Sequence, residues 1–166
     1  MCTVKTLHDM RGRWALITGA VGHLGRTISE TLSELGANLI LVDRSEADLL
    51  ERKSEIEKLY PIECRIVECD LCSKESRLEL IQTVRHSCSN LSCLINNAAF
   101  VGTTDLPGWN APISEQSSEV WGQVFEVNLV SIFHLCQALM PLLEKGEGAN
   151  VINVASIYGE LGPDWS

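Results

Sequence analysis

The stretch WALITGAVGHLG, residues 14–25, decides the fold of this chain. Its first five residues, WALIT (14–18), form an apolar run that ends at Gly19 and predicts a short buried strand. Apolar residues then recur at helical spacing as far as Gly36, a residue typical of helix ends: Leu24, Ile28, Leu32 and Leu35. The sequence therefore predicts a strand, a glycine-rich turn and a helix in direct succession.

Further apolar runs alternate with helical patterns along the rest of the chain. Buried strands are expected at NLILVD (38–43), ECRIVECD (63–70), LSCLINNAA (91–99) and VINV (151–154). Helices are expected from Ser45, as a capping residue, to before Pro61, from near Ser73, and from about Ser117 to Glu144, with Pro141 bending or ending the last one. Residues 100–116, with two prolines, are expected to form a loop over the strand ends.

This alternation predicts an α/β fold. Strands that are apolar throughout are typical of a parallel sheet, because right-handed crossovers place helices over both of its faces. We expect a Rossmann-type three-layer sandwich with strand order 3-2-1-4-5. Residues 1–166 have the length of one domain and show no second composition regime, so we expect a single domain.

Charge and hydropathy exclude several classes of partner. The chain carries 13 basic and 22 acidic side chains, a net charge of -9 that repels phosphate backbones and anionic membranes, so we expect no nucleic acid and no membrane partner. No apolar run approaches the roughly 18 residues that would span a bilayer. The N-terminus MCTVKTLHDMRGRW lacks the apolar stretch of a signal peptide, so the expected location is the cytosol.

Seven cysteines are scattered through predicted strands and helices, as is typical of reduced thiols. Cys69 and Cys72 form a CxxC motif, but no second CxxC or HxxxH motif completes a zinc site. The four histidines show no metal-ligand spacing with one another. We therefore expect no metal site.

The glycine-rich turn is the first candidate functional feature. After the first strand of such a sheet, helix N-terminal amides point at a dinucleotide pyrophosphate and glycines let the backbone approach it, so Gly19, Gly22 and Gly25 predict dinucleotide binding. Asp43 ends the second strand, where a carboxylate can accept both ribose hydroxyls of NAD and would repel the 2'-phosphate of NADP. Arg44 could instead pair with that phosphate. We expect NAD as the preferred cofactor, with NADP as the alternative.

At this point the chain resembles the short-chain dehydrogenase/reductase family, over residues 11–160. The resemblance rests on five motifs in the family's order: TGAVGHLG (18–25), CDL (69–71), NNAA (96–99), VNL (127–129) and NVAS (153–156). It implies that the following residues bind the cofactor: Gly19, Gly22, His23, Leu24, Gly25, Asp43, Arg44, Asp70, Leu71, Asn97 and Ala98. It also implies that Ser156 orients the substrate oxygen and that Asn128 supports a proton-relay water.

Two residues depart from the classical family pattern. His23 stands where the middle glycine is expected, which gives the spacing GxxGxxG of the extended, nucleotide-sugar branch. His23 could lie near the pyrophosphate or point outward, and both alternatives remain open. Ala99 replaces the last glycine of NNAG.

The family's catalytic tyrosine and lysine, in the motif YxxxK, have no counterpart in residues 1–166. Tyr60 and Tyr158 are the two tyrosines, and Tyr158 is followed four residues later by Gly162. The resemblance thus implies an N-terminal portion of a reductase, C-terminally incomplete and truncated after the fifth strand. As it stands, that portion would be inactive, and its fifth strand would be an exposed, association-prone edge.

Several functions remain open. The resemblance implies an NAD(P)-dependent oxidoreductase, homo-oligomeric when complete, that acts on a small carbonyl or alcohol substrate, either sugar-related or a 3-oxoacyl group. A non-catalytic dinucleotide-binding module is one alternative. A nucleotide-sugar epimerase or dehydratase of the extended branch is another.

Overall fold

The computed structural model describes residues 8–101, 107–109 and 111–156. Its strands form one parallel sheet in the order β3-β2-β1-β4-β5, which confirms the predicted order. The strands are β1 (Trp14–Thr18), β2 (Asn38–Asp43), β3 (Cys64–Glu68), β4 (Cys93–Asn96) and β5 (Asn150–Asn153). β3 and β4 are shorter than expected, because residues 69–70 and 97–99 leave the sheet at its carboxyl edge, where they are available to a site.

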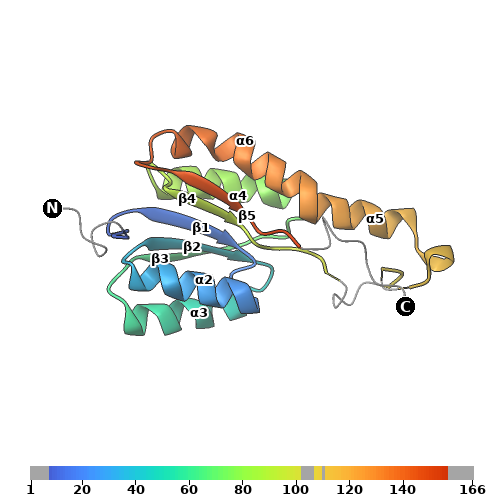
Figure 1. The fold of residues 1–166 in the computed structure, drawn as a ribbon, viewed down its shortest axis with the longest axis horizontal. Coiled ribbons are helices and arrows are strands. Elements are labelled where there is room, and N and C mark those ends of the chain that lie inside the picture. The colour runs from blue at the N-terminus through green and yellow to red at the C-terminus, as the bar shows by residue number, and fades with distance from the viewer. Residues whose placement is uncertain (1–7, 102–106, 110, 157–166) are drawn as a thin grey trace.

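Helices cover both faces of the sheet, as predicted (Figure 1). On one face lie α2 (His23–Glu34) and α3 (Glu46–Leu59). On the other lie α4 (Lys74–Ser87) and α6 (Ser131–Leu143), and α5 (Ser118–Phe125) continues the line of α6 beyond the sheet. A short 3-10 turn, η1 (Ile113–Glu115), precedes α5. The structure therefore has the three-layer arrangement of a Rossmann-type sandwich.

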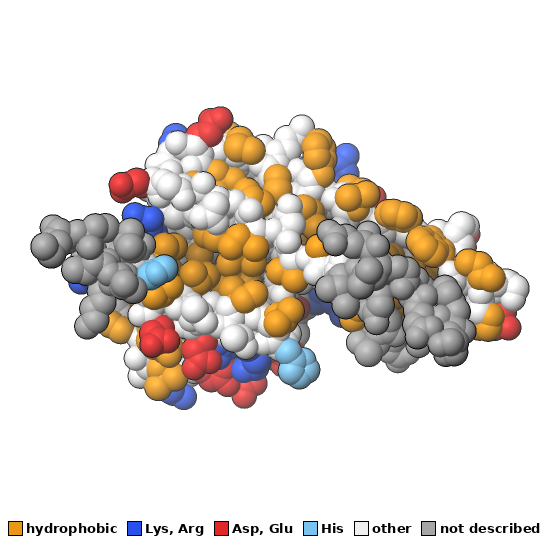
Figure 2. Space-filling model, in the orientation of Figure 1, with side chains coloured by type: hydrophobic (Ala, Val, Ile, Leu, Met, Phe, Trp, Pro, Cys, Tyr) orange, Lys and Arg blue, Asp and Glu red, His pale blue; other side chains and the backbone are white. Residues whose placement is uncertain are grey.

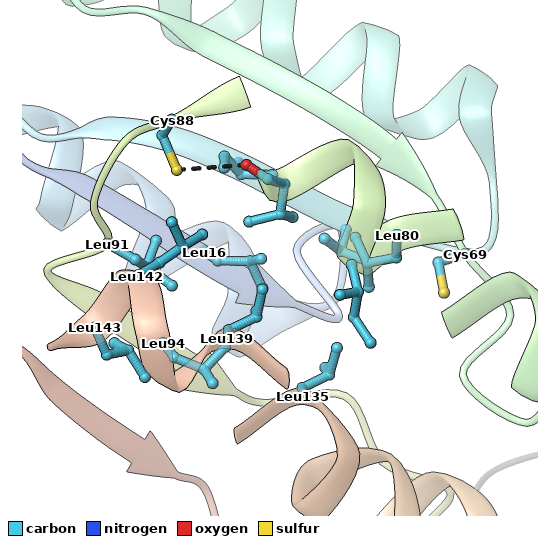
Figure 3. Close-up of a cluster of buried hydrophobic side chains, with 14 of the residues drawn as sticks. Leu16, Cys69, Leu80, Cys88, Leu91, Leu94, Leu135, Leu139, Leu142 and Leu143 are labelled. Carbon is cyan, nitrogen blue, oxygen red and sulfur yellow. Dashed lines mark hydrogen bonds between the residues drawn. The ribbon is translucent and has the colours of Figure 1, made fainter. Parts of the chain in front are cut away.

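The core lies on both sides of β1, because successive side chains of a strand point to opposite faces. Leu16 packs in a cluster with Leu80, Leu135 and Leu139 beneath α4 and α6 (Figure 3). Ile17 packs in the second cluster, with α2 and α3, and both residues are fully buried. The core therefore anchors β1 from both faces.

The predicted helix boundaries follow from capping chemistry. The Ser45 hydroxyl accepts a hydrogen bond from Asp48 N at 3.3 Å, and the Ser73 hydroxyl accepts one from Ser76 N at 3.2 Å. Gly36 follows α2 with φ +87°, a conformation that favours glycine.

The predicted single helix over residues 117–144 is interrupted by a π-helical turn, η2 (Glu126–Val130). Such turns insert one residue into an α-helix and are frequent at functional sites. Pro141 lies inside α6, which ends two residues later at Leu143.

Among the described residues, one helical run, from Ser118 to Leu143, is long and apolar enough to cross a membrane by length and composition, with mean hydropathy 1.4. The expectation that no segment has this character is therefore wrong, because it considered only uninterrupted apolar residues. The inner face of the run belongs to the core, where Leu135 and Leu139 are fully buried. Core helices of sheet proteins pass the same test.

β5 differs from the other strands in its exposure. It pairs with β4 and forms the edge of the sheet among the described residues, and all four of its residues are exposed. The expectation of a buried strand is wrong here, whereas that of an exposed edge is confirmed. Figure 2 shows hydrophobic side chains across the centre of this view and along α5. Large exposed side chains on α5, η2 and α6 include Trp121, Phe125, Leu129 and Phe133.

Candidate functional site

A cavity of about 430 Å³ opens at the carboxyl ends of β1, β2, β3 and β4. In open parallel sheets, ligands bind at this edge where the strand order reverses, here between β1 and β4. Most of the predicted cofactor residues line the cavity: Gly19, Gly22, His23, Leu24, Asp43, Arg44, Asp70, Leu71, Asn97 and Ala98. The fold thus brings residues from four separate segments to one place.

The glycine turn provides backbone space and amide donors. Gly19 has φ +67°, and a Cβ there would lie 2.9 Å from Ala98 Cα. Gly22 is the N-cap residue of α2, where no side chain caps the helix and no acidic residue occupies the first turn. The first amides of a helix lack partners within it, so they can donate to an anion such as a pyrophosphate.

Gly25 lies beneath the glycine turn, and its role in cofactor binding stays a prediction. It is buried, it is absent from the cavity lining, and a Cβ there would lie 2.0 Å from Gly19 O. Its role in this structure is to let α2 pack against the turn. His23 and Leu24 are exposed and line the cavity, so the His23 side chain is both at the site and at the surface.

Asp43 is held by two backbone amides. Its Oδ2 accepts a hydrogen bond from Val21 N at 3.1 Å, and its Oδ1 accepts one from Arg44 N at 2.8 Å. A carboxylate oxygen has two acceptor sites, so each oxygen can still accept a hydroxyl. The Arg44 guanidinium lies over the Phe100 ring, 5.7 Å from its centroid. A carboxylate and a cation therefore lie side by side at the end of β2.

The ends of β1 and β4 are joined through Thr18, which the sequence analysis did not single out. Its hydroxyl accepts hydrogen bonds from Asn97 N at 3.0 Å and Ala98 N at 3.1 Å. The Asn97 side chain donates to the carbonyl oxygens of Thr18 and Gly19, both at 3.0 Å. Asn97 thus fixes the glycine turn as well as lining the cavity. Thr18 could have been found as the polar last residue of an apolar strand.

Asp70 and Leu71 follow β3 at the far end of the cavity. The Asp70 carboxylate accepts a hydrogen bond from Cys72 N at 2.9 Å, which shapes the turn before α4. Burial raises the pKa of both the Cys69 and the Cys72 thiols above their ordinary value. Protonated thiols are poor nucleophiles and poor metal ligands, so the CxxC pair has no activated member.

Asn128 lies in the π-turn and contacts the loop after β4. Its Oδ1 accepts a hydrogen bond from Phe100 N at 2.8 Å, and its Nδ2 donates to Phe100 O at 2.9 Å. Phe100 lines the cavity, whereas Asn128 does not. The structure thus gives Asn128 a supporting role for the cavity wall, and its role in a proton relay stays a prediction.

Ser156 is the last described residue of the chain and follows β5 by three positions. It is exposed and is not among the described residues that line the cavity. Its role in orienting a substrate oxygen stays a prediction. Tyr158 lies outside the described residues.

Sequence reasoning missed the apolar lining of the cavity: Val21, Val42, Cys69, Ala99, Phe100, Val101 and Val127. Ala99 had been noted only as a departure from a motif. Val21 lies inside TGAVGHLG, Val127 begins VNL and Phe100 directly follows NNAA. Proximity to these motifs could therefore have indicated the apolar lining. An apolar wall with a few polar groups is typical of sites for aromatic cofactors.

A glycine turn at a helix N-terminus, an acidic residue at the end of β2 and a mostly apolar cavity that both of them line define a dinucleotide-binding α/β protein. The family model for short chain dehydrogenases matches residues 13–165. The chain therefore belongs to the short chain dehydrogenase family. This match does not favour the extended-branch alternative.

Individual relatives agree with the family. The oxidoreductase YciK of Escherichia coli (strain K12) is 31% identical over 155 residues, which is 92% of this chain and 59% of YciK. A rhamnolipids biosynthesis 3-oxoacyl-[acyl-carrier-protein] reductase of Pseudomonas aeruginosa is 29% identical, over 91% of this chain and 57% of its own length. The crystal structure of L-sorbose reductase from Gluconobacter frateurii with NADPH and L-sorbose has a TM-score of 0.84 and 28% identity, over 95% of this chain and 57% of that one. The chain thus spans just under three fifths of the length of these relatives.

Proposed function

We propose that this chain forms the cofactor-binding part of an NAD(P)-dependent oxidoreductase that transfers a hydride between nicotinamide and a carbonyl or alcohol substrate. The observation that carries the proposal is the cavity at the carboxyl ends of β1 to β4, which is lined by the uncapped N-terminus of α2 and by Asp43. The amides suit a pyrophosphate and the carboxylate suits a ribose. A bound nicotinamide supplies the hydride acceptor or donor.

We further propose that NAD is preferred over NADP. The 2'-phosphate that NADP carries on its ribose would be repelled by the Asp43 carboxylate, which two amides hold in place at the end of β2. Arg44 lies over Phe100 and could attract that phosphate. Similar crystal structures contain NADP or NADPH, so the preference for NAD rests on Asp43 alone.

Titration of the purified chain with NADH and with NADPH, followed by nicotinamide fluorescence and calorimetry, tests both proposals. We expect NADH to bind more tightly, and Asp43→Asn to weaken NADH and strengthen NADPH, each by about tenfold, because one charged hydrogen-bond partner and one repulsion are lost. Asp48→Asn is the matched control, since Asp48 is exposed on α3 and does not line the cavity. Binding of neither nucleotide would contradict the function, and tighter NADPH binding would contradict only the preference.

A second candidate, a dinucleotide-binding chain without catalysis, is favoured by one observation: residues 1–166 contain no YxxxK sequence. We propose that a polypeptide of these residues binds the cofactor but does not turn over carbonyl substrates, because the tyrosine and lysine of the family's YxxxK motif are absent from residues 1–166. Incubation with cofactor and a panel of sugars and 3-oxoacyl thioesters tests this. Turnover that Ser156→Ala abolishes would contradict it and would support Ser156 as a catalytic residue.

The substrate class, the assembly and the location are also proposals. The printed names of relatives support either a ketose or a 3-oxoacyl group as the substrate of the whole protein. Self-association is supported by the exposed apolar side chains on α5, η2 and α6, in a region from residue 117 to 143 without Lys or Arg. A reducing cytosolic location is supported by the six described cysteines, all of them free thiols.

A further inference from the structure

Three charged side chains connect α3, α2 and the glycine turn. Arg52 on α3 is a buried arginine, with 8% of its side chain exposed, and its Nη1 lies 3.0 Å from Glu55 Oε2. The same oxygen of Glu55 lies 2.8 Å from Arg26 Nη1 on α2. Arg52 Nη2 also donates to Arg26 O at 2.6 Å and to Ser29 Oγ at 2.9 Å. Arg52 therefore fixes both Glu55 and the backbone of Arg26.

This network ends at the residue whose backbone shapes the cavity wall. Arg26 Nε donates a hydrogen bond to Val21 O at 3.2 Å, and Val21 N donates to Asp43 Oδ2 at 3.1 Å. The two peptide groups that flank Val21 are thus each held by a charged side chain, one from α2 and one from β2. Val21 itself lines the cavity.

The direction of the Val21 carbonyl has a chemical consequence. A carbonyl oxygen that faces a pyrophosphate repels it, whereas an amide that faces the same group attracts it. The hydrogen bond from Arg26 keeps the Val21 carbonyl oxygen directed toward the guanidinium, and the Val21 N–H remains hydrogen-bonded to Asp43. One arginine can therefore set the orientation of the turn and, through Val21, of the carboxylate.

We infer that Arg26 is a positioning residue for the dinucleotide site and that it acts through the Val21 peptide groups while Glu55 and Arg52 hold it in place. The inference rests on the proposed function, because it assigns a role at the same site. Hydrogen bonding from Arg52 lowers the pKa of Glu55 below its ordinary value, so Glu55 is ionised at neutral pH. A cation near a phosphate site can also bind the phosphate directly. Glu55 would support Arg26 in the positioning role, whereas it would compete with the phosphate in the direct role.

Glu55→Gln separates the two roles by the sign of its effect. If Arg26 acts by positioning, the substitution loosens Arg26 and weakens NADH binding. If Arg26 contacts the phosphates directly, the substitution releases the cation from a competing anion and strengthens NADH binding. Glu51→Gln is the matched control, because Glu51 is exposed on the same helix and the change in net charge is identical.

We expect Glu55→Gln and Arg26→Met each to weaken NADH binding by about tenfold, as is typical when a charged hydrogen-bond partner is lost, and Glu51→Gln to leave it unchanged. Tighter or unchanged binding by Glu55→Gln would overturn the inference. Amide hydrogen exchange at Val21 in the protein without nucleotide provides a second measurement, with faster exchange expected in Glu55→Gln and Arg26→Met. Unchanged exchange in both variants would overturn the inference. Absence of NADH binding by the unsubstituted chain would overturn the proposed function, and hydrogen exchange at Val21 would then still test whether Arg26 and Glu55 hold the turn.

Discussion

β1 and β5 are both apolar strands of the same parallel sheet, and each leads into a candidate site segment. Yet residues 15–18 of β1 are at most 1% exposed, whereas Ile152 of β5 is 48% exposed. β1 has a strand on either side and a core cluster on each face, whereas β5 pairs with β4 as the edge of the described sheet. Apolar content thus shows which strands are suited to a core, and their neighbours decide whether they are buried. The stability of the site should therefore come from the β1 side.

The most direct test of the difference in burial between β1 and β5 is to shorten one side chain in each strand. Leu16→Ala should lower the free energy of unfolding by about 3 kcal/mol, because Leu16 is fully buried among leucines and the change leaves a cavity. Ile152→Ala should lower it by less than about 1 kcal/mol, since a half-exposed side chain loses less burial. Urea unfolding measures both. Equal losses would show that β5 is as well packed as β1.

The next effect concerns the turn after β1. Gly25→Ala should destabilise the chain by about 2 kcal/mol and weaken NADH binding, because the new Cβ would lie 2.0 Å from Gly19 O and force α2 away from the turn. Gly22→Ala is the control for stability alone, since its Cβ would lie 3.4 Å from the same oxygen and the cost should stay within about 1 kcal/mol. Thermal unfolding and NADH titration measure the pair. Similar effects at the two glycines would show that the turn adapts to the new side chain.

The sequence predicted most of the fold because its signals are local. Ser45, Ser73 and Gly36 mark helix ends by capping chemistry that depends on a few neighbouring residues. The alternation of strands and helices predicted a parallel sheet, and the strand order followed from its assignment as a Rossmann-type fold. The π-turn at Glu126–Val130 was not predicted, because buried positions recur every three or four residues both before and after it, as they do in an uninterrupted α-helix. The contact of Asn128 with Phe100 is visible only in the structure.

The sequence predicted the glycines and the charged residues of the candidate site but not the hydrogen bonds that connect them. Asp43 was found from its position at the end of β2, whereas its hydrogen bond with Val21 joins residues 22 positions apart and depends on the pairing of β1 with β2. Gly25 was assigned to the cofactor because it belongs to the motif, and the structure adds that α2 lies too close to Gly19 O at this position for a Cβ. Sequence spacing gives the residues of a site, and tertiary contacts give their roles.

The dependence of stability on alkaline pH tests how well the core around β1 is buried. Cys64 of β3 is the reporter, because it packs in the same cluster as Ile17. Burial raises the pKa of the Cys64 thiol from 9.0 to about 12. Since the protonated form is favoured in the folded state, its contribution to stability is fully present below pH 9 and is lost as the pH rises toward 12. The free energy of unfolding should fall by up to about 1.4 kcal/mol per pH unit in that range.

Cys64→Ala separates this thiol from the other buried ones. The slope of stability against pH between 9 and 11 should become shallower in this variant, as measured by urea unfolding at a series of pH values. An unchanged slope would show that Cys64 titrates alike in the folded and unfolded states.

The smallest expected effect lies on β5. The sheet register pairs Ile152 with Ile95, on the face of α2 and α3, and Val151 with Leu94, on the face of α6. Ile152→Lys should change the free energy of unfolding by less than about 1 kcal/mol, because half of this side chain already contacts solvent, and should reduce self-association, because a charge on an edge strand disfavours pairing. Val151→Lys should cost more, since α6 contacts β5 on that face. Unfolding together with light scattering tests both, and a larger loss from Ile152→Lys than from Val151→Lys would show that a second copy covers the face of β5 that α2 and α3 leave exposed.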